Sequence, residues 1–131
     1  MINLLVLKET FENEKRVALV PDEVKKYFDL GFKVTIEKDA GIKSGFSNED
    51  YKRYGANISQ NIEKSIKESD IIIKIQKPDP RIIKEIKTGA ILIGLLSPTK
   101  NSSENTFYNK KKISAFALEN IPRITRAQDK D

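Results

Sequence analysis

The pattern of apolar and polar positions alternates between strand-like and helix-like segments. Short apolar runs or apolar–polar alternation, which are typical of strands, occur at residues 2–7, 32–37, 70–75, 90–96 and 113–118. Helical spacing with start and stop signals occurs at residues 21–30, 48–54, 61–68, 80–87 and 101–112. Strands that alternate with helices predict an α/β fold with a parallel sheet and helices on both faces. In such sheets, ligands bind beyond the carboxyl ends of the strands.

Length and composition indicate one globular domain over residues 1–131. The chain is 38% hydrophobic and 33% charged, and no apolar run approaches the roughly 20 residues of a membrane helix, so we expect a soluble chain. It contains no cysteine and no histidine. Thiolate chemistry, disulfides and the commonest general base and metal ligand are therefore excluded. Any proton chemistry would have to use carboxylates, lysine or tyrosine, or lie outside this chain. We expect no metal site and assign no catalytic residue.

The net charge of +5 raises the question of nucleic-acid binding. The lysines are scattered, with a single run at residues 110–112, and no aromatic residues interleave with them as stacking platforms. A general bias toward Lys, Ile and Asn explains the charge, so we expect no nucleic-acid partner.

The segment 8–21, K-E-T-F-E-N-E-K-R-V-A-L-V-P, follows the first predicted strand. It places Lys8, Glu9 and Arg16 near the carboxyl edge of the sheet, where Arg16 could clamp a carboxylate or phosphate. The alternative is a solvated loop whose surface ion pairs contribute little. Composition alone favours the solvated loop.

The segment 39–47, D-A-G-I-K-S-G-F-S, has two glycines and could bind phosphate through backbone N–H groups. It matches neither G-x-G-x-x-G nor a P-loop. Ser47, with Asp50 three residues later, is more simply the N-cap of the next helix, and we favour that interpretation.

The segment 76–80, Q-K-P-D-P, ends a buried strand at the predicted binding edge. Turn chemistry explains its prolines, and Pro80 is expected to begin the next helix. Gln76 and Lys77 could face a ligand, although both residue types are common on surfaces.

The densest group of candidate ligand-binding side chains is P-R-I-T-R-A-Q-D-K-D, residues 122–131, after the last predicted strand. Arg123 and Arg126 are three residues apart, as are Gln128 and Asp131, so each pair would share one face of a helix. These groups can hold a carboxamide, a phosphate or a ribose hydroxyl. An amphipathic helix start with a solvated face accounts for them equally well. A site that begins so close to the last residue of the sequence is expected to be incomplete.

Seven segments, taken in order, resemble the N-terminal domain of the alpha subunit of proton-translocating NAD(P) transhydrogenase, a layout that alanine dehydrogenases share. The segments are K-E-T-F-E-N-E-K-R-V-A-L-V-P, A-G-I-K-S-G-F-S-N-E-D-Y, Y-G-A-N-I, S-D-I-I-I-K-I-Q-K-P, G-A-I-L-I-G-L-L-S-P, F-A-L-E-N-I-P-R-I-T-R-A-Q and the final D.

This resemblance implies a flavodoxin/Rossmann-like three-layer half of a two-domain NAD-binding component, truncated before the half that carries G-x-G-x-x-G. It implies that Arg123, Gln128 and Asp131 line the nicotinamide end of an NAD(H) site. It further implies hydride transfer to NADP(H) on a separate component, coupled to proton translocation. The implied partners are the rest of the alpha subunit, the NADP-binding component, the membrane beta subunit and a second copy in a homodimer, at the cytoplasmic face of the bacterial inner membrane.

Two alternatives remain open from the sequence. An alanine dehydrogenase-like domain would use an Arg–Lys–His anion site. Arg16 matches the arginine, but Gln76 stands at the lysine position with Lys77 beside it, and G-L-L-S-P replaces the histidine loop. A non-catalytic remnant or interaction module is the other alternative, because the cofactor-binding half is missing and residues 129–130 depart from the family motif.

Overall fold

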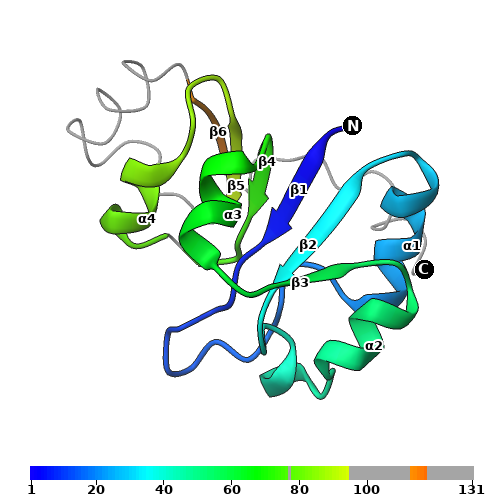
Figure 1. The fold of residues 1–131 in the computed structure, drawn as a ribbon. Coiled ribbons are helices and arrows are strands. Elements are labelled where there is room, and N and C mark those ends of the chain that lie inside the picture. The colour runs from blue at the N-terminus through cyan, green and yellow to red at the C-terminus, as the bar shows by residue number, and fades with distance from the viewer. Residues whose placement is uncertain (77, 95–112, 118–131) are drawn as a thin grey trace, which may run out of the picture.

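Parallel strands form a single sheet in the region of the molecule that the structure describes. The computed structural model describes residues 1–76, 78–94 and 113–117, and in these residues the sheet has six strands in the order β3-β2-β1-β4-β5-β6 (Figure 1). The strands are β1 (Asn3–Val6), β2 (Lys33–Glu37), β3 (Asn57–Ser59), β4 (Ile71–Ile73), β5 (Ile91–Gly94) and β6 (Ser114–Ala117). The helices are α1 (Pro21–Asp29), the 3-10 helix η1 (Ile42–Ser44), α2 (Asn48–Arg53), α3 (Ile62–Glu68) and α4 (Pro80–Glu85).

The expected α/β fold with a parallel sheet is confirmed. Each of the five predicted strands is present, and so are four of the five predicted helices, with ends shifted by a few residues. The predicted helix at 101–112 lies outside the described residues. Two elements were not predicted, β3 and η1, because three residues are too few to establish a period.

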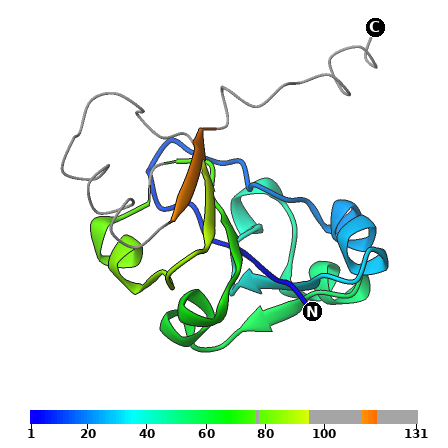
Figure 2. The ribbon, with the colours of Figure 1, turned by 90° about the horizontal axis from the view of Figure 1, so that it is seen from above.

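The central strands are covered on both faces, as the β-branched runs predict. Leu4 and Val6 of β1 pack beneath α1 and α2, whereas Leu5 and Leu7 pack beneath α3 and α4. Figure 2 shows the sheet between these two layers of helices. In β4 the same alternation places Ile72 on the α3 and α4 side.

Two predicted helix starts are confirmed in atomic detail. The Ser47 hydroxyl accepts a hydrogen bond from the Asp50 backbone N–H at 3.1 Å, and the Asp50 carboxylate accepts one from the Ser47 N–H at 2.8 Å. This reciprocal pair is a capping box, so the segment 39–47 forms turns and a cap. Pro80 begins α4, with Asp79 as its cap.

The long loop after β1 is tethered to the layer of α1 and α2. The fully buried Tyr51 donates its hydroxyl to the Leu19 carbonyl at 2.8 Å. Burial raises the pKa of Tyr51 to about 12, so the phenol keeps the proton that it donates. Gly41 leaves room for this ring, because a Cβ there would lie 2.7 Å from Tyr51 Cε2. The Ser44 hydroxyl holds the same loop at the Lys15 carbonyl.

We expect Tyr51→Phe to lower the free energy of unfolding by about 1–3 kcal/mol, because it leaves the buried Leu19 carbonyl without its donor. Urea denaturation measures this change. Tyr54→Phe is the matched control, since Tyr54 follows the same helix and is only partly buried; we expect its effect to stay within about 0.5 kcal/mol. Equal losses in the two variants would contradict the tether.

Candidate functional site at the sheet switch point

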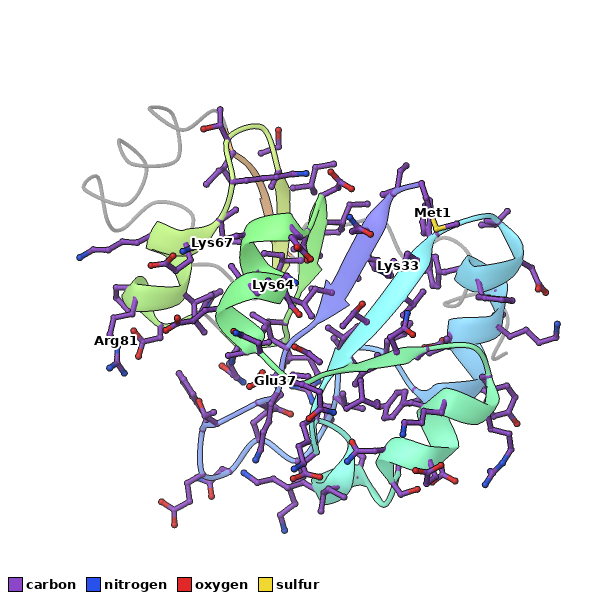
Figure 3. The ribbon with its side chains drawn as sticks, viewed as in Figure 1. Met1, Lys33, Glu37, Lys64, Lys67 and Arg81 are labelled. Atoms are coloured by element: carbon purple, nitrogen blue, oxygen red, sulfur yellow. The ribbon has the colours of Figure 1, made fainter. Side chains whose placement is uncertain are left out.

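The candidate site lies where the strand order reverses. β1 pairs with β2 on one side and with β4 on the other, and the chain builds β2 and β3 before it crosses to β4. The carboxyl ends of β1 and β4 are therefore neighbours whose continuing segments serve opposite halves of the sheet. Open α/β sheets bind ligands at such a point. In Figure 3, Glu37 marks this carboxyl edge at the end of β2, and Met1 and Lys33 mark the amino edge.

A buried carboxylate joins the two segments that leave β1 and β4. Glu9 is 3% exposed, and its carboxylate accepts from Lys74 Nζ at 3.0 Å, from the Ile75 N–H at 2.7 Å and from the Gln76 N–H at 3.0 Å. Lys74 is 2% exposed, and its ammonium also lies 5.5 Å from the centre of the Phe11 ring. The two buried charges are thus paired, and the carboxylate is hydrogen-bonded through both of its oxygens, the condition under which proteins retain such groups.

A second carboxylate gathers the polar side chains at the mouth of the site. Glu14 Oε2 accepts from Arg16 Nε at 2.8 Å, and Glu14 Oε1 accepts from Arg16 Nη2 at 3.0 Å and from Gln76 Nε2 at 2.7 Å. The hydrogen bonds from Arg16, followed by that from Gln76, lower the pKa of Glu14 to about 2. Arg16 is 68% exposed in its side chain, so this array faces solvent while its centre is buried.

Glu37 closes the inner side of the site. Its carboxylate accepts the Lys8 N–H at 2.6 Å. Burial raises the pKa of Glu37, and the hydrogen bond from Lys8 together with the charges of Lys8 and Lys74 opposes some of that rise. Three carboxyl groups (Glu9, Glu14 and Glu37) and three cations (Lys8, Arg16 and Lys74) therefore meet around the ends of β1, β2 and β4.

The structure brings together two of the predicted site residues. Arg16 and Gln76 share the Glu14 carboxylate, as expected of groups at one sheet edge. Lys77, Arg123, Gln128 and Asp131 lie outside the described residues.

The interpretation of segment 8–21 as a solvated loop is wrong for two of its three acids. Glu9 and Glu14 are buried, and only Arg16 behaves as a surface ion-pairing group. Sequence reasoning passed over Glu14 and Lys74. Lys74 could have indicated the site from the sequence, because a lysine inside the buried β-branched run D-I-I-I-K-I needs an acidic partner.

No metal-binding constellation occurs among residues 1–76, 78–94 and 113–117: no three His, Cys, Asp or Glu side chains there are grouped to hold an ion. Within the same residues, no helix is long and apolar enough to cross a membrane.

The sheet has the strand order of a dinucleotide-binding fold without the chemistry of that site at its switch point. A dinucleotide site needs a glycine-rich turn that leads directly into a helix, so that backbone N–H groups meet the pyrophosphate. Here the long segment 7–20 separates β1 from α1, and G-x-G-x-x-G occurs nowhere in the sequence. Glu9 and Glu14 already pair with Lys74 and Arg16, the positive groups that a pyrophosphate at this edge would need.

Strand order, layers and switch point define a Rossmann-like α/β domain that offers a rigid polar edge. The chain belongs to the family described as "Alanine dehydrogenase/PNT, N-terminal domain", whose model matches residues 5–131.

Relatives come from both branches that the family description names. The chain is 38% identical to NAD(P) transhydrogenase subunit alpha of Haemophilus influenzae over 96% of its own length and 24% of the relative's. It is 41% identical to alanine dehydrogenase 1 of Staphylococcus aureus over 94% of this chain and 32% of that protein. The crystal structure of transhydrogenase from Sinorhizobium meliloti superposes with a TM-score of 0.84 at 33% identity, covering 96% of this chain and 37% of that one.

The chain therefore spans between about a quarter and about a third of the length of these relatives. An L-alanine dehydrogenase structure gives a TM-score of 0.80 at 25% identity, which confirms the fold across both branches.

The low pKa of Glu14 predicts a pH-dependent contribution to stability. A carboxylate whose pKa falls from 4.5 to about 2 on folding stabilises the native state above pH 4.5, and this contribution disappears as pH falls through 2. We expect Glu14→Gln to lower the free energy of unfolding at pH 7 by about 1 kcal/mol, because the exposed Arg16 is screened by solvent. The difference between wild type and variant should shrink between pH 4.5 and 2.

Urea titrations at several pH values measure that difference directly. Glu12→Gln is the matched control, since Glu12 lies on the same loop and is exposed. A gap between wild type and Glu14→Gln that stays constant down to pH 2 would refute the assignment.

Proposed function

We propose that this chain is the N-terminal region of the NAD(H)-binding component of a proton-translocating NAD(P) transhydrogenase. The observation that carries the proposal is 38% identity to a transhydrogenase alpha subunit over 96% of the chain, together with the segment P-R-I-T-R-A-Q. In the proposal, NAD(H) supplies the hydride and a separate component holds NADP(H). The rest of the alpha subunit and a membrane beta subunit complete the assembly at the cytoplasmic face of the inner membrane, with the NAD(H)-binding component as a homodimer.

The chain's own role in this proposal is to form one wall of the NAD(H) cleft. Arg123, Gln128 and Asp131 hold the nicotinamide end, where an arginine and an amide can bind a carboxamide and an aspartate can accept from NH₂ or hydroxyl groups. The geometry of β6 supports this assignment. It runs parallel to β5 and ends at Ala117, so the chain leaves it at the carboxyl edge, the same edge as Arg16 and Gln76.

The side chains at the carboxyl edge suit one part of the cofactor and not another. The crevice between β1 and β4 already holds Glu9, Lys74 and Glu14, so it suits a wall beside the cofactor and does not suit a pyrophosphate. We therefore assign the pyrophosphate to the region of the relatives that lies beyond the matched segment. Hydride transfer requires positioning of the donor and acceptor rather than an acid or base, in keeping with a chain that lacks histidine.

An alanine dehydrogenase-like function is the second candidate, since identity to the Staphylococcus aureus enzyme reaches 41%. Its anion site would need positive groups where this chain has Gln76 and G-L-L-S-P. Arg16 is the one matching group, and Glu14 already neutralises it.

We expect Arg123→Ala and Gln128→Ala each to weaken NADH binding about 10- to 100-fold, the effect of losing one hydrogen bond to a charged or buried polar group. The measurement is a calorimetric titration of a chimera in which this chain replaces the aligned segment of the Haemophilus influenzae relative. Arg53→Ala is the matched control, because Arg53 is an exposed arginine on α2 that pairs with Asp50. Unchanged affinity in both site variants would overturn the site.

The same chimera, joined to the relative's other subunits, should transfer hydride between NADH and an NADP⁺ analogue. A chimera that folds and binds NADH but transfers no hydride would instead favour a non-catalytic remnant.

We also expect the chimera to show no oxidation of L-alanine with NAD⁺ above background, because Gln76 cannot supply the second positive charge that an α-keto acid carboxylate needs. Spectrophotometric assays at saturating alanine, with the Staphylococcus aureus enzyme as positive control, measure this activity. Turnover that Arg16→Ala abolishes would favour the alanine dehydrogenase function.

A further inference from the structure

We propose that Glu9 is a positioning residue: its buried carboxylate fixes the backbone after β4 so that the Gln76 carboxamide meets Glu14 and holds Arg16 at the edge of the site. The ion pair with Lys74 offsets the cost of burying the carboxylate, whereas the two backbone hydrogen bonds hold the backbone from which the Gln76 side chain extends.

The contacts around Glu9 do more than an ion pair requires. Lys74 Nζ donates to Oε1 at 3.0 Å, which forms the ion pair. The remaining capacity goes to two consecutive backbone groups, with Ile75 N–H on Oε2 at 2.7 Å and Gln76 N–H on Oε1 at 3.0 Å. Two successive N–H groups bound to one buried carboxylate fix the peptide planes on either side of Ile75, and with them the position of the Gln76 Cα atom.

The Gln76 side chain links this backbone to the mouth of the site. Gln76 Nε2 reaches Glu14 Oε1 at 2.7 Å, and Glu14 binds Arg16 through both of its oxygens. A continuous chain of hydrogen bonds thus runs from the buried Glu9 to the exposed guanidinium. Its two halves come from segments more than 60 residues apart in the sequence, so local turn geometry alone does not align them.

The test separates the backbone contacts from the ion pair by comparing two variants. Lys74→Met removes the ammonium and keeps the Glu9 carboxylate with both of its N–H partners. It destabilises the fold, because the buried carboxylate loses its counter-charge, so its spectra are compared under conditions in which the variant is folded. The double variant Glu9→Gln/Lys74→Met removes both charges. Ile75 N–H and Gln76 N–H bind different oxygens of the Glu9 carboxylate, so the amide places an NH₂ donor opposite one of them and that N–H loses its acceptor.

Two readouts on the full chain are measured by NMR. Amide hydrogen exchange reports the protection of Ile75 and Gln76 relative to the amides of β2, and ¹H–¹⁵N spectra report the Gln76 carboxamide and the Arg16 Nε–H. In the double variant we expect protection at Ile75 and Gln76 to fall about 10- to 100-fold more than in β2. The Gln76 and Arg16 side-chain signals should shift toward their positions in Glu14→Gln, whereas Lys74→Met should leave them near their wild-type positions.

A uniform loss of protection over the whole sheet, or unshifted Gln76 and Arg16 signals in the double variant, would overturn the proposal and leave Glu9 as a structural ion-pair partner. Should the double variant fail to fold, Glu9→Asp gives the same test, because it keeps the charge but is one methylene too short to reach both N–H groups. The inference rests on the proposed function in one respect: it takes from it that Arg16 faces the NAD(H) cleft. Since these readouts need no cofactor, a chimera that fails to bind NADH would count against the proposed function alone.

Discussion

The ion pair between Glu9 and Lys74 is the constraint on which the candidate site depends. Removing two charges from water costs several kcal/mol per ion, and good geometry with further hydrogen bonds is needed to offset that cost. Here the carboxylate has three donors, and the described residues contain no buried side-chain nitrogen or oxygen without a hydrogen-bond partner. Removing one partner from such a pair costs about 3–5 kcal/mol. The loop after β1 and the segment after β4 therefore keep their relative positions in the folded state.

The strand order of this domain does not by itself determine what binds at its switch point. Its described strands have the order of a dinucleotide-binding sheet, yet the switch point is occupied by the protein's own charges. A fold determines where a site can lie, and the side chains at that place determine its chemistry. In this chain that location is a polar edge of paired charges, which is compatible with the proposed role as one wall of a cleft.

Much of the fold could be predicted from the sequence because its signals are local. The runs at 70–75 and 90–96 are apolar enough to require burial on both faces, and Ser47 and Pro80 mark helix starts within a few residues. β3 was missed because N-I-S is only three residues long and forms its strand by pairing with β2. The site was harder to predict because its central contacts join Glu9 to Lys74 and Gln76, which are 65 and 67 residues away. Only the unusual position of Lys74 inside a β-branched run indicated such a partner.

The balance of charge at the mouth of the site bears on the choice between the two branches of the family. An α-keto acid needs uncompensated positive groups, because its carboxylate must leave water for the site. In this chain Glu14 takes two hydrogen bonds from the Arg16 side chain, and Gln76 adds a neutral donor rather than a second cation. The array is therefore balanced in charge, and an anion that bound Arg16 would compete with Glu14 for the guanidinium. A charge-balanced edge of this kind is poorly suited to bind an α-keto acid carboxylate. It is better suited to position a neighbouring group, and hydride transfer requires such positioning.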